Sequence, residues 1–300
     1  MAGPLLLTDV PWLLYRSFFA LPKSIVDADG RPVNALLGTV NAVLTLIDAQ
    51  PAAGRPRGVV SCLGAEQAAY RVELYPAYHA HRDPMPAELR DQWGRAPELL
   101  ASFGWTIADA AELEADDAMG SFARVESQAG GSALLLTADR DLYQCVNEHV
   151  ACLDLGKGGA CSVLGESQVH DRYGIAPGQV PDFIALRGDP SDGLPGAPGI
   201  GAKTAAELLR VHGNLEALLK HAEQQSGDGG IGELRPRIAQ SLHENADLLR
   251  TFKRIATLVE LDVERPPDTL TDFAGGAAKA REIGMKRLAE RLDELAAAAK

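Results

Sequence analysis

Short apolar runs that alternate with helix-like segments constrain the first half of this chain more than any other feature. The runs that we predict to be strands cover residues 5–8, 58–63, 106–108, 132–136 and 150–154. Helical patterns lie near residues 34–48, 97–103 and 114–127. Buried parallel strands appear in a sequence as continuous apolar runs, so this alternation predicts an α/β fold, a parallel sheet with helices on both faces.

The second half of the chain has a different pattern. From Ser167 onward it is mainly helical, with breaks at glycine and proline. Residues 187–201 form a predicted loop before a helix at 203–211, and the apolar spacing at 279–300 predicts a packed terminal helix. We therefore expect an α/β core at 1–165, and a helical sub-domain with C-terminal helices at 166–300.

Charge narrows the possible partners. The chain has 300 residues, of which 46% are hydrophobic, and a formal net charge of −12. The apolar content supports a sizeable core. A negative net charge argues against binding nucleic acid, whose phosphates attract Lys and Arg. Two interpretations remain: either the acidic residues are solvated surface, or many of them converge on bound cations.

Neither the cysteines nor the apolar segments predict a secreted or membrane protein. The four cysteines form no C-x-x-C pair and are predicted to be free thiols in a reducing cytosol. Cys152 and Cys161 flank a glycine-rich turn, where a hairpin would let them face each other. No apolar stretch is long enough for a membrane helix. We expect a soluble, cytoplasmic protein with no membrane partner.

Acidic side chains recur where predicted strands end, or in the later glycine-proline loop. In chain order these residues are Asp9, Glu114, Asp116, Asp117, Asp139, Asp141, Asp189 and Asp192. Ligands of open α/β sheets bind beyond the carboxyl ends of the strands. Gathered carboxylates repel one another unless cations neutralise them, and oxygen ligands favour Mg²⁺ or Mn²⁺. The pattern predicts a site for two or more such ions, which suits phosphodiester hydrolysis.

Two further segments suggest contact with nucleic acid. The first is the glycine-rich run 196–204, in which Gly199 and Gly201 precede Lys203 and Thr204 at a predicted helix start. Small residues let a backbone approach a phosphate, and helix N-termini favour anions. The second is 70–90, where aromatic and basic residues interleave as in single-strand binding surfaces.

These segments together resemble the 5′-nuclease family, which includes the 5′→3′ exonuclease domain of bacterial DNA polymerase I, its free-standing relatives and phage flap endonucleases. The resemblance covers roughly residues 5–260. Its motifs are Asp-x-x-x-Leu-x-Tyr-Arg at 9–16, Glu-Ala-Asp-Asp at 114–117, Thr-Ala-Asp-Arg-Asp-Leu-Tyr-Gln at 137–144 and Gly-Asp-Pro-Ser-Asp-Gly-Leu-Pro-Gly at 188–196. The string at 137–144 is highly specific.

The resemblance implies a fold and a reaction. The fold is a PIN-like α/β core, with an arch-like segment at 71–97 and a DNA-binding helix-three-turn-helix at about 178–212. The reaction is metal-dependent 5′→3′ exonuclease and flap endonuclease cleavage, in replication or repair. The implied partner is DNA with a 5′ flap, nick or recessed 5′ end, bound by a monomer. The implied cofactors are Mg²⁺ or Mn²⁺, with K⁺ at the helix-three-turn-helix.

The resemblance also implies residue roles. Asp9, Glu114, Asp116 and Asp117 serve a first metal site, and Asp139, Asp141, Asp189 and Asp192 serve a second. The implied catalytic residues are Asp9, Arg16, Arg71 and Arg82, of which Arg16 and Arg71 steady phosphates. The implied DNA-binding residues are Tyr78, His79, Gly199, Gly201, Lys203 and Thr204.

The chain departs from the family pattern at two important positions. Gly64 stands where the family has a metal-binding aspartate, and His79 stands where it has a lysine that assists catalysis. Water or Glu66 are candidates to replace the missing ligand. Three hypotheses stay open: an active nuclease, a catalytically impaired protein that binds branched DNA, and a PIN-type ribonuclease. The helix-three-turn-helix string argues against the ribonuclease.

In the 71–97 segment, prolines disfavour one long helix. Pro76, Pro84, Pro86 and Pro97 all fall within it. We therefore predict short helices and loop over the active site rather than a tall helical arch.

Overall fold

The computed structural model describes residues 3–49, 55–156, 161–224 and 234–298. Within them, one six-stranded sheet has the order β3-β2-β1-β4-β5-β6. The strands are β1 (Leu5–Asp9), β2 (Gly58–Leu63), β3 (Thr106–Asp109), β4 (Ala133–Leu136), β5 (Val150–Leu155) and β6 (Cys161–Leu164). Neighbouring strands β1 to β5 pair in parallel, and β6 pairs antiparallel with β5. The expected parallel sheet is confirmed, and β6 adds an antiparallel edge.

The β5–β6 hairpin corrects one expectation about the cysteines. Cys152 lies opposite Leu164 in the register, and Cys161 lies opposite Leu155, so the two thiols do not face each other. All four cysteines are free. Most of the glycine-rich turn between the strands, at 157–160, lies outside the described residues.

The central strand β1 divides the core between the two faces of the sheet. Leu5 and Leu7 point into one apolar cluster and Leu6 into the other, and all three are fully buried. This alternation follows from the two-residue repeat of a strand. Because β1 lies between β2 and β4, the chain order reverses beside it, and a crevice opens at the carboxyl ends of these strands.

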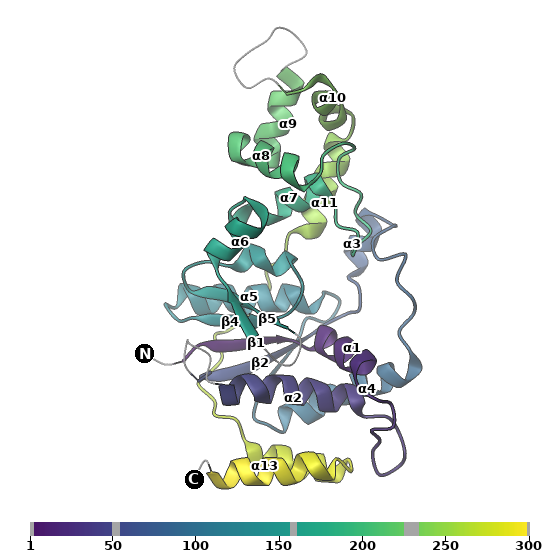
Figure 1. Ribbon diagram of the computed structural model, residues 1–300, viewed down its shortest axis with the longest axis vertical. Helices are drawn as coiled ribbons and strands as arrows, with labels where there is room; N and C mark the ends of the chain where they lie inside the picture. The colour runs from purple at the N-terminus through teal and green to yellow at the C-terminus, as the bar shows by residue number, and fades with distance from the viewer. Residues whose placement is uncertain (1–2, 50–54, 157–160, 225–233, 299–300) are drawn as a thin grey trace.

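Helices cover both faces of the sheet, as expected. On one face lie α1 (Val10–Ala20), α2 (Asn34–Ala49) and α4 (Ala87–Ala101). On the other lie α5 (Ala115–Gln128) and the 3₁₀ helix η1 (Asp141–Cys145). Figure 1 shows α2 beneath the strands, α5 above them and α1 beside the end of β1. The acidic residues that follow the strands thus lie at the carboxyl ends of the sheet, on the side of α5.

The 71–97 segment contains no single long helix, as the prolines predicted. It runs from α3 (Ala69–Leu74) through irregular chain into α4, whose N-cap is Pro86. The helix predicted to start at residue 97 instead starts ten residues earlier, at Ala87, and Pro97 lies inside it. Tertiary packing of Leu89, Leu99 and Leu100 in the core explains why α4 continues through a proline.

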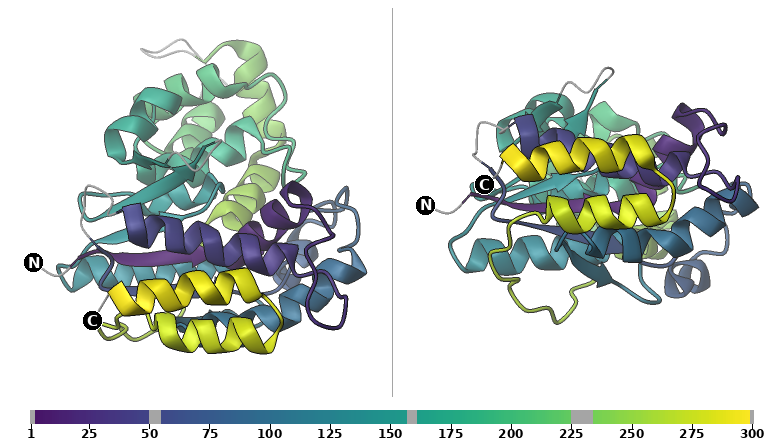
Figure 2. Two further views of the ribbon diagram at one scale, coloured as in Figure 1. Left: turned by 60° about the horizontal axis from the view of Figure 1, so that its bottom comes forward. Right: turned by 90° about the horizontal axis from the view of Figure 1, so that it is seen from below.

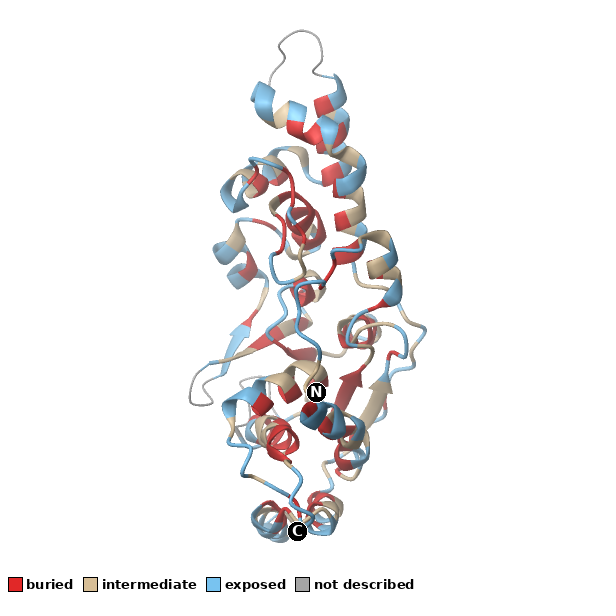
Figure 3. Ribbon diagram, turned by 90° about the vertical axis from the view of Figure 1, so that its right-hand side faces the viewer, coloured by how far each residue is buried: buried red, intermediate tan, exposed pale blue. Residues whose placement is uncertain are grey.

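A helical part follows the sheet. Its elements are α6 (Glu166–Tyr173), the 3₁₀ helix η3 (Pro177–Gln179), α7 (Val180–Arg187), α8 (Ala202–His212), α9 (Leu215–Gln224), α10 (Pro236–Glu244) and α11 (Ala246–Ala256). It stands above the sheet in Figure 1 and makes the molecule elongated. In Figure 3, buried residues run along the inner sides of these helices, while their outer sides are exposed.

After α11 the chain returns to the core. Residues 257–272, here called the strap, descend past the sheet, where Thr269 N donates to Arg57 O and Asp272 N donates to Phe103 O, both at 2.8 Å. The strap leads to α12 (Phe273–Glu282) and α13 (Lys286–Ala298), which lie beneath α2 and α4 (Figure 2). Gly284, with φ of 82°, separates them, so the single terminal helix that we expected is two.

These last helices belong to the core and not to the helical part. Phe273, Leu288 and Leu292 are buried in the same apolar cluster as α1 and α2. These two helices therefore pack with the α/β core, although they follow the helical part in the sequence. Among the described residues, no helix has the length and apolar character needed to span a bilayer.

Candidate active site

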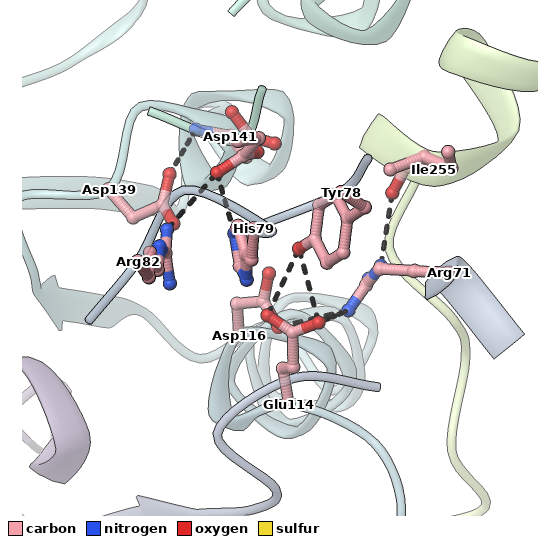
Figure 4. Close-up of a pocket in the computed structure, with 10 residues that line it drawn as sticks. Arg71, Tyr78, His79, Arg82, Glu114, Asp116, Asp139, Asp141 and Ile255 are labelled. Atoms are coloured by element: carbon pink, nitrogen blue, oxygen red, sulfur yellow. Dashed lines mark hydrogen bonds and ion pairs between the residues drawn. The ribbon is translucent and has the colours of Figure 1, made fainter. Parts of the chain in front are cut away.

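A cavity of about 50 Å³ lies above the carboxyl ends of the central strands. Its walls come from α5, the turn after β4, the glycine-proline loop at 188–201 and the 71–97 segment. The residues that line it are Arg71, Tyr78, His79, Arg82, Glu114, Asp116, Asp139, Asp141, Asp192 and Ile255 (Figure 4). We call this space the acidic cavity.

Asp9 joins the ends of two strands below the cavity. It caps α1, where its Oδ1 accepts from Trp12 N at 3.0 Å, and its Oδ2 accepts from the Thr137 hydroxyl at 2.8 Å. Burial raises the pKa of Asp9, although these two hydrogen bonds act in the opposite direction. Both oxygens therefore have protein partners, and Asp9 is not among the cavity-lining residues.

The acidic start of α5 is organised around Arg71. The Arg71 guanidinium donates to both oxygens of Asp117, at 2.8 and 3.0 Å, and lies 2.9 Å from Glu114 Oε1. Its Nε donates to the Ile255 carbonyl at 3.1 Å. Burial alone would lower the pKa of Arg71, but the charges of Asp116, Glu114 and Asp117 raise it well above the ordinary value. Arg71 is thus a fixed internal cation.

Asp117 is fully buried, and its carboxylate connects neighbouring segments of the chain. Its Oδ1 also accepts from Val259 N at 2.7 Å, and its Oδ2 accepts from Glu114 N at 3.2 Å. With Arg71 it connects α5, α3 and the strap. The structure therefore separates Asp117 from Glu114 and Asp116, which do line the cavity.

Asp139 and Asp141 lie in the tight turn after β4. Asp139 N donates to the Thr137 hydroxyl oxygen at 3.0 Å, and Asp141 N donates to Asp139 Oδ1 at 2.9 Å. Burial, together with the charge of Asp192, raises the pKa of Asp139 to about 7. Burial and the charge of Asp139 raise the pKa of Asp141 well above its ordinary value. The cavity thus concentrates negative charge away from solvent.

The glycine-proline loop contributes one of its two aspartates to the cavity. Asp189 is buried, and its Oδ1 accepts from Ser191 N at 2.8 Å and from the Ser191 hydroxyl at 2.5 Å. Asp192 lines the cavity. The loop folds tightly here because Gly188 and Gly196 approach each other, and a Cβ on Gly196 would lie 2.3 Å from Gly188 N. Asp189 therefore shapes the loop that presents Asp192.

The irregular part of the 71–97 segment closes the cavity from above. The Tyr78 hydroxyl donates to the Glu114 carboxylate and lies 3.1 and 3.2 Å from its two oxygens. His79 Nε2 lies 2.9 Å from Asp192 Oδ1, and Arg82 Nη2 lies 3.3 Å from the same oxygen. These contacts connect the segment to both acidic walls of the cavity (Figure 4).

Gly64 occupies a place where no side chain fits. Ala65 N donates to Leu113 O at 2.7 Å, so the end of β2 lies directly against the turn before α5. A Cβ on Gly64 would lie 2.4 Å from Leu113 O. Glu66, our candidate replacement ligand, is exposed, accepts a hydrogen bond from the Tyr15 hydroxyl and does not line the cavity.

The remaining implied residues lie outside the cavity. Arg16 is exposed on α1, with its guanidinium carbon 5.9 Å from the centre of the Trp12 ring. Gly199, Gly201, Lys203 and Thr204 lie at the start of α8, where Lys203 is exposed. Gly199 has φ of 80° and no atom within 4 Å of an added Cβ, so the backbone here is open to a partner.

Two contributors to the site had little or no sequence signal. The Ile255 carbonyl accepts from Arg71, and Val259 N donates to Asp117. Both backbone groups lie more than 140 residues further along the chain than their partners. No motif marks these backbone groups. Thr137, which bonds Asp9, could have been found, because a hydroxyl directly follows a buried strand there.

The donor set of the acidic cavity fits hard divalent cations. Among the described residues, no three His, Cys, Asp or Glu side chains already stand in the arrangement of a metal site. The cavity nevertheless gathers carboxylates from three separate segments, and burial with mutual repulsion raises the pKa of Asp116, Asp139 and Asp141. A cation among these oxygens would relieve that repulsion, so the residues present suit Mg²⁺ or Mn²⁺.

Comparison with known proteins gives the same family in both halves of the chain. Residues 4–174 match the N-terminal resolvase-like domain of the 5′-3′ exonuclease family, and residues 175–274 match its C-terminal SAM fold. A 5′-3′ exonuclease of Mycobacterium tuberculosis is 34% identical, over 98% of this chain and 99% of that protein. The thermostable DNA polymerase I of Thermus thermophilus is 35% identical, and the match spans 97% of this chain but 32% of the polymerase.

Solved structures show the same fold. The T5 D15 protein crystallised with metal ions aligns over 98% of this chain and 99% of its own, with a TM-score of 0.66 and 16% identity. The catalytic core of Rad2 in complex with DNA substrate aligns over 97% of this chain and 91% of its own, with a TM-score of 0.65 and 14% identity. Two family matches that together cover most of the chain, and a relative matched along its whole length, show that this chain belongs to the 5′-3′ exonuclease family.

Proposed function

We propose that this chain hydrolyses DNA phosphodiester bonds as a divalent-metal-dependent 5′→3′ exonuclease and 5′-flap endonuclease, in replication or repair. The observation that supports it best is the acidic cavity, in which Glu114, Asp116, Asp139, Asp141 and Asp192 converge. The proposed substrate is DNA with a 5′ flap, nick or recessed 5′ end. The protein is proposed to act as a monomer in the cytoplasm.

The proposed metal ligands are the five carboxylates that line the cavity. When bound, Mg²⁺ or Mn²⁺ would supply positive charge to a phosphodiester undergoing displacement. Asp9, Asp117 and Asp189 have their oxygens engaged by protein donors, so in this proposal they position the walls of the cavity.

The cationic side chains divide between two roles. Arg71 is 1% exposed and bonds Asp117, so we propose that it orients the acidic start of α5 and does not contact a phosphate. Arg82 is exposed at the cavity, and it is the residue that we propose contacts a phosphate near the reacting bond. Arg16, exposed on α1, is proposed to contact the DNA backbone further out.

The start of α8 provides a second contact with DNA in this proposal. Open backbone at Gly199 and Gly201, followed by the exposed Lys203 and the half-buried Thr204, suits a sequence-independent phosphate contact. A K⁺ ion at this turn is part of the same proposal. Tyr78 and His79 are buried against Glu114 and Asp192, so they reach DNA only if the 71–97 segment moves.

A cleavage assay on a 5′-labelled flap tests the proposal. We expect products only with Mg²⁺ or Mn²⁺, and we expect Asp139→Asn to abolish cleavage while DNA binding persists. Asp171→Asn, an exposed aspartate on α6, is the matched control and should cleave normally. Normal turnover by Asp139→Asn would disprove the assigned site. Binding without cleavage at any metal concentration would instead favour the impaired branched-DNA-binding protein, and preference for an RNA flap would favour a ribonuclease.

A further inference from the structure

One nitrogen atom in the wall of the acidic cavity lacks a partner. His79 is 4% exposed, and its Nε2 lies 2.9 Å from Asp192 Oδ1. Its Nδ1 is buried and makes no hydrogen bond. Buried polar atoms are nearly always paired, so an unpaired ring nitrogen beside a cavity points to a missing ligand.

The hydrogen bond from His79 Nε2 to Asp192 leaves Nδ1 able to act as a ligand. When Nε2 carries the proton and donates it to Asp192, Nδ1 keeps a free lone pair. Arg82 already supplies positive charge to the same Asp192 oxygen. In known metal sites, a ligating histidine almost always donates its other N–H to a carboxylate, a backbone carbonyl or water, and the Asp192–His79 pair has the first of these arrangements.

Backbone hydrogen bonds and a ring contact keep the imidazole in this position. His79 has φ of 54°, a left-handed conformation that is uncommon outside glycine. His79 N donates to Asp192 O at 3.0 Å, and Arg82 N donates to His79 O at 2.9 Å. The ring stacks on Tyr78, with centroids 3.8 Å apart. In Figure 4 the ring points from the upper wall of the cavity toward Asp116.

We propose that His79 Nδ1 is a nitrogen ligand for a divalent ion held by the carboxylates of the acidic cavity. This inference rests on the proposed metal-dependent function. The cavity of about 50 Å³, which His79 helps to line, has room for an ion and a few waters. Imidazole favours first-row transition ions over Mg²⁺, so His79 would shift the preference of this site toward Mn²⁺.

Pulsed EPR of the full-length protein with Mn²⁺ and no DNA tests the inference directly. We expect ¹⁴N modulation from a directly bound imidazole in the wild type. His79→Asn should lose this signal, because asparagine ligates through oxygen while still tolerating the left-handed backbone. The matched control is His81→Asn, an exposed histidine two residues away, which should keep the signal.

Metal titrations provide the second measurement. We expect His79→Asn to weaken Mn²⁺ binding by about tenfold or more, and Mg²⁺ binding by less. Circular dichroism should confirm that each variant is folded. If wild-type protein binds Mn²⁺ without ¹⁴N modulation, and His79→Asn binds it equally well, His79 only positions Asp192 and the inference is wrong while the proposed function stands. If the wild type binds no divalent ion, the proposed function fails with it.

Discussion

At Gly64, the end of β2 and the turn before α5 are joined by the hydrogen bond from Ala65 N to Leu113 O. The family resemblance implied an aspartate at this position. The close backbone approach explains why this chain has glycine, because a Cβ would lie 2.4 Å from the Leu113 oxygen. The absent ligand is therefore part of how this core packs, and one substitution cannot restore it.

We accordingly predict that Gly64→Ala and Gly64→Asp both lower the free energy of unfolding, by about 1–3 kcal/mol, because overpacking displaces backbone. Neither should cleave DNA faster than wild type. Gly94→Ala is the control, since Gly94 lies in α4 with no atom within 4 Å of an added Cβ, and it should be neutral or slightly stabilising. Urea unfolding measures the stabilities. A large gain of cleavage by Gly64→Asp would show instead that the cavity lacks a ligand that it can accommodate.

The sequence predicted which acidic residues gather, but not how each one is used. Asp9 and Asp139 follow buried parallel strands, so their approach follows from strand order alone. Whether a carboxylate faces the cavity or a protein donor depends on distant partners. Asp117 turns to Arg71 and Val259 N, which no local pattern connects to it.

Among the secondary-structure elements, the strands were easier to predict than the helix boundaries. A fully buried strand such as β4 has a continuous apolar run that ends with the strand. The start of α4 at Ala87 had no such signal, because its first turns are largely polar and the internal Pro97 suggested a later beginning. The edge strand β6 is mostly exposed and carries little apolar pattern.

The start of α8 gives a prediction about DNA binding. Lys203→Ala should weaken binding of duplex DNA. It should also make the slope of log K against log salt concentration shallower by about 1, because Lys203 would release one counterion from the DNA when it contacts a phosphate. Fluorescence anisotropy over a salt series measures both quantities. Lys286→Ala, exposed on α13 at the far side of the core, should leave them unchanged. Equal salt slopes for wild type and Lys203→Ala would exclude this contact.

A buried ion-pair network connects α5 to the strap. Glu126 is 1% exposed, and both Arg57 and Arg265 donate to its two oxygens at 2.5–3.1 Å. Burial alone would raise the pKa of Glu126, but the hydrogen bonds from Arg265 and Arg57 lower it below the ordinary value. The carboxylate therefore stabilises the fold above the ordinary glutamate pKa, and this stabilisation is lost as the pH falls through the lowered pKa.

We predict that Glu126→Gln lowers the free energy of unfolding at pH 7 by about 3–5 kcal/mol, because it leaves buried Arg57 with only the exposed Asp268 as a charge partner. The difference from wild type should stay constant down to about pH 5 and shrink below about pH 4. Chemical denaturation at several pH values measures it. Glu290→Gln, on the exposed surface of α13, should show no such difference. If the stability difference between Glu126→Gln and wild type did not change with pH, the substitution would act through side-chain shape and not through the lost charge.

On the scale of the whole molecule, the helical part is an insertion into the core. The sheet precedes it, and the strap with α12 and α13 follows it back to the opposite side of the sheet (Figure 2). Sequence patterns showed a helical second half but not this return, because amphipathic spacing marks a buried face without identifying its partner. The return places Leu288 and Leu292 in the cluster that contains Leu6.

We predict that Leu292→Ala lowers the free energy of unfolding by about 2–5 kcal/mol, because a fully buried leucine leaves a cavity in the core. The same substitution at Leu270, which is 80% exposed on the strap, should change it by less than about 0.5 kcal/mol. Thermal and urea unfolding measure both. If Leu292→Ala is as stable as wild type, α13 contributes little to the core, and a chain that ends before α12 should fold equally well.

The return of the chain also governs when the core can form during synthesis. Leu6 in the first strand and Leu292 in α13 share one apolar cluster, although almost the entire described chain separates them. Contacts this distant in sequence form late and slow the folding of a domain. A ribosome must therefore release α13 before the outer sides of α2 and α4 are covered, and until then the apolar residues there are exposed to chaperones and to aggregation.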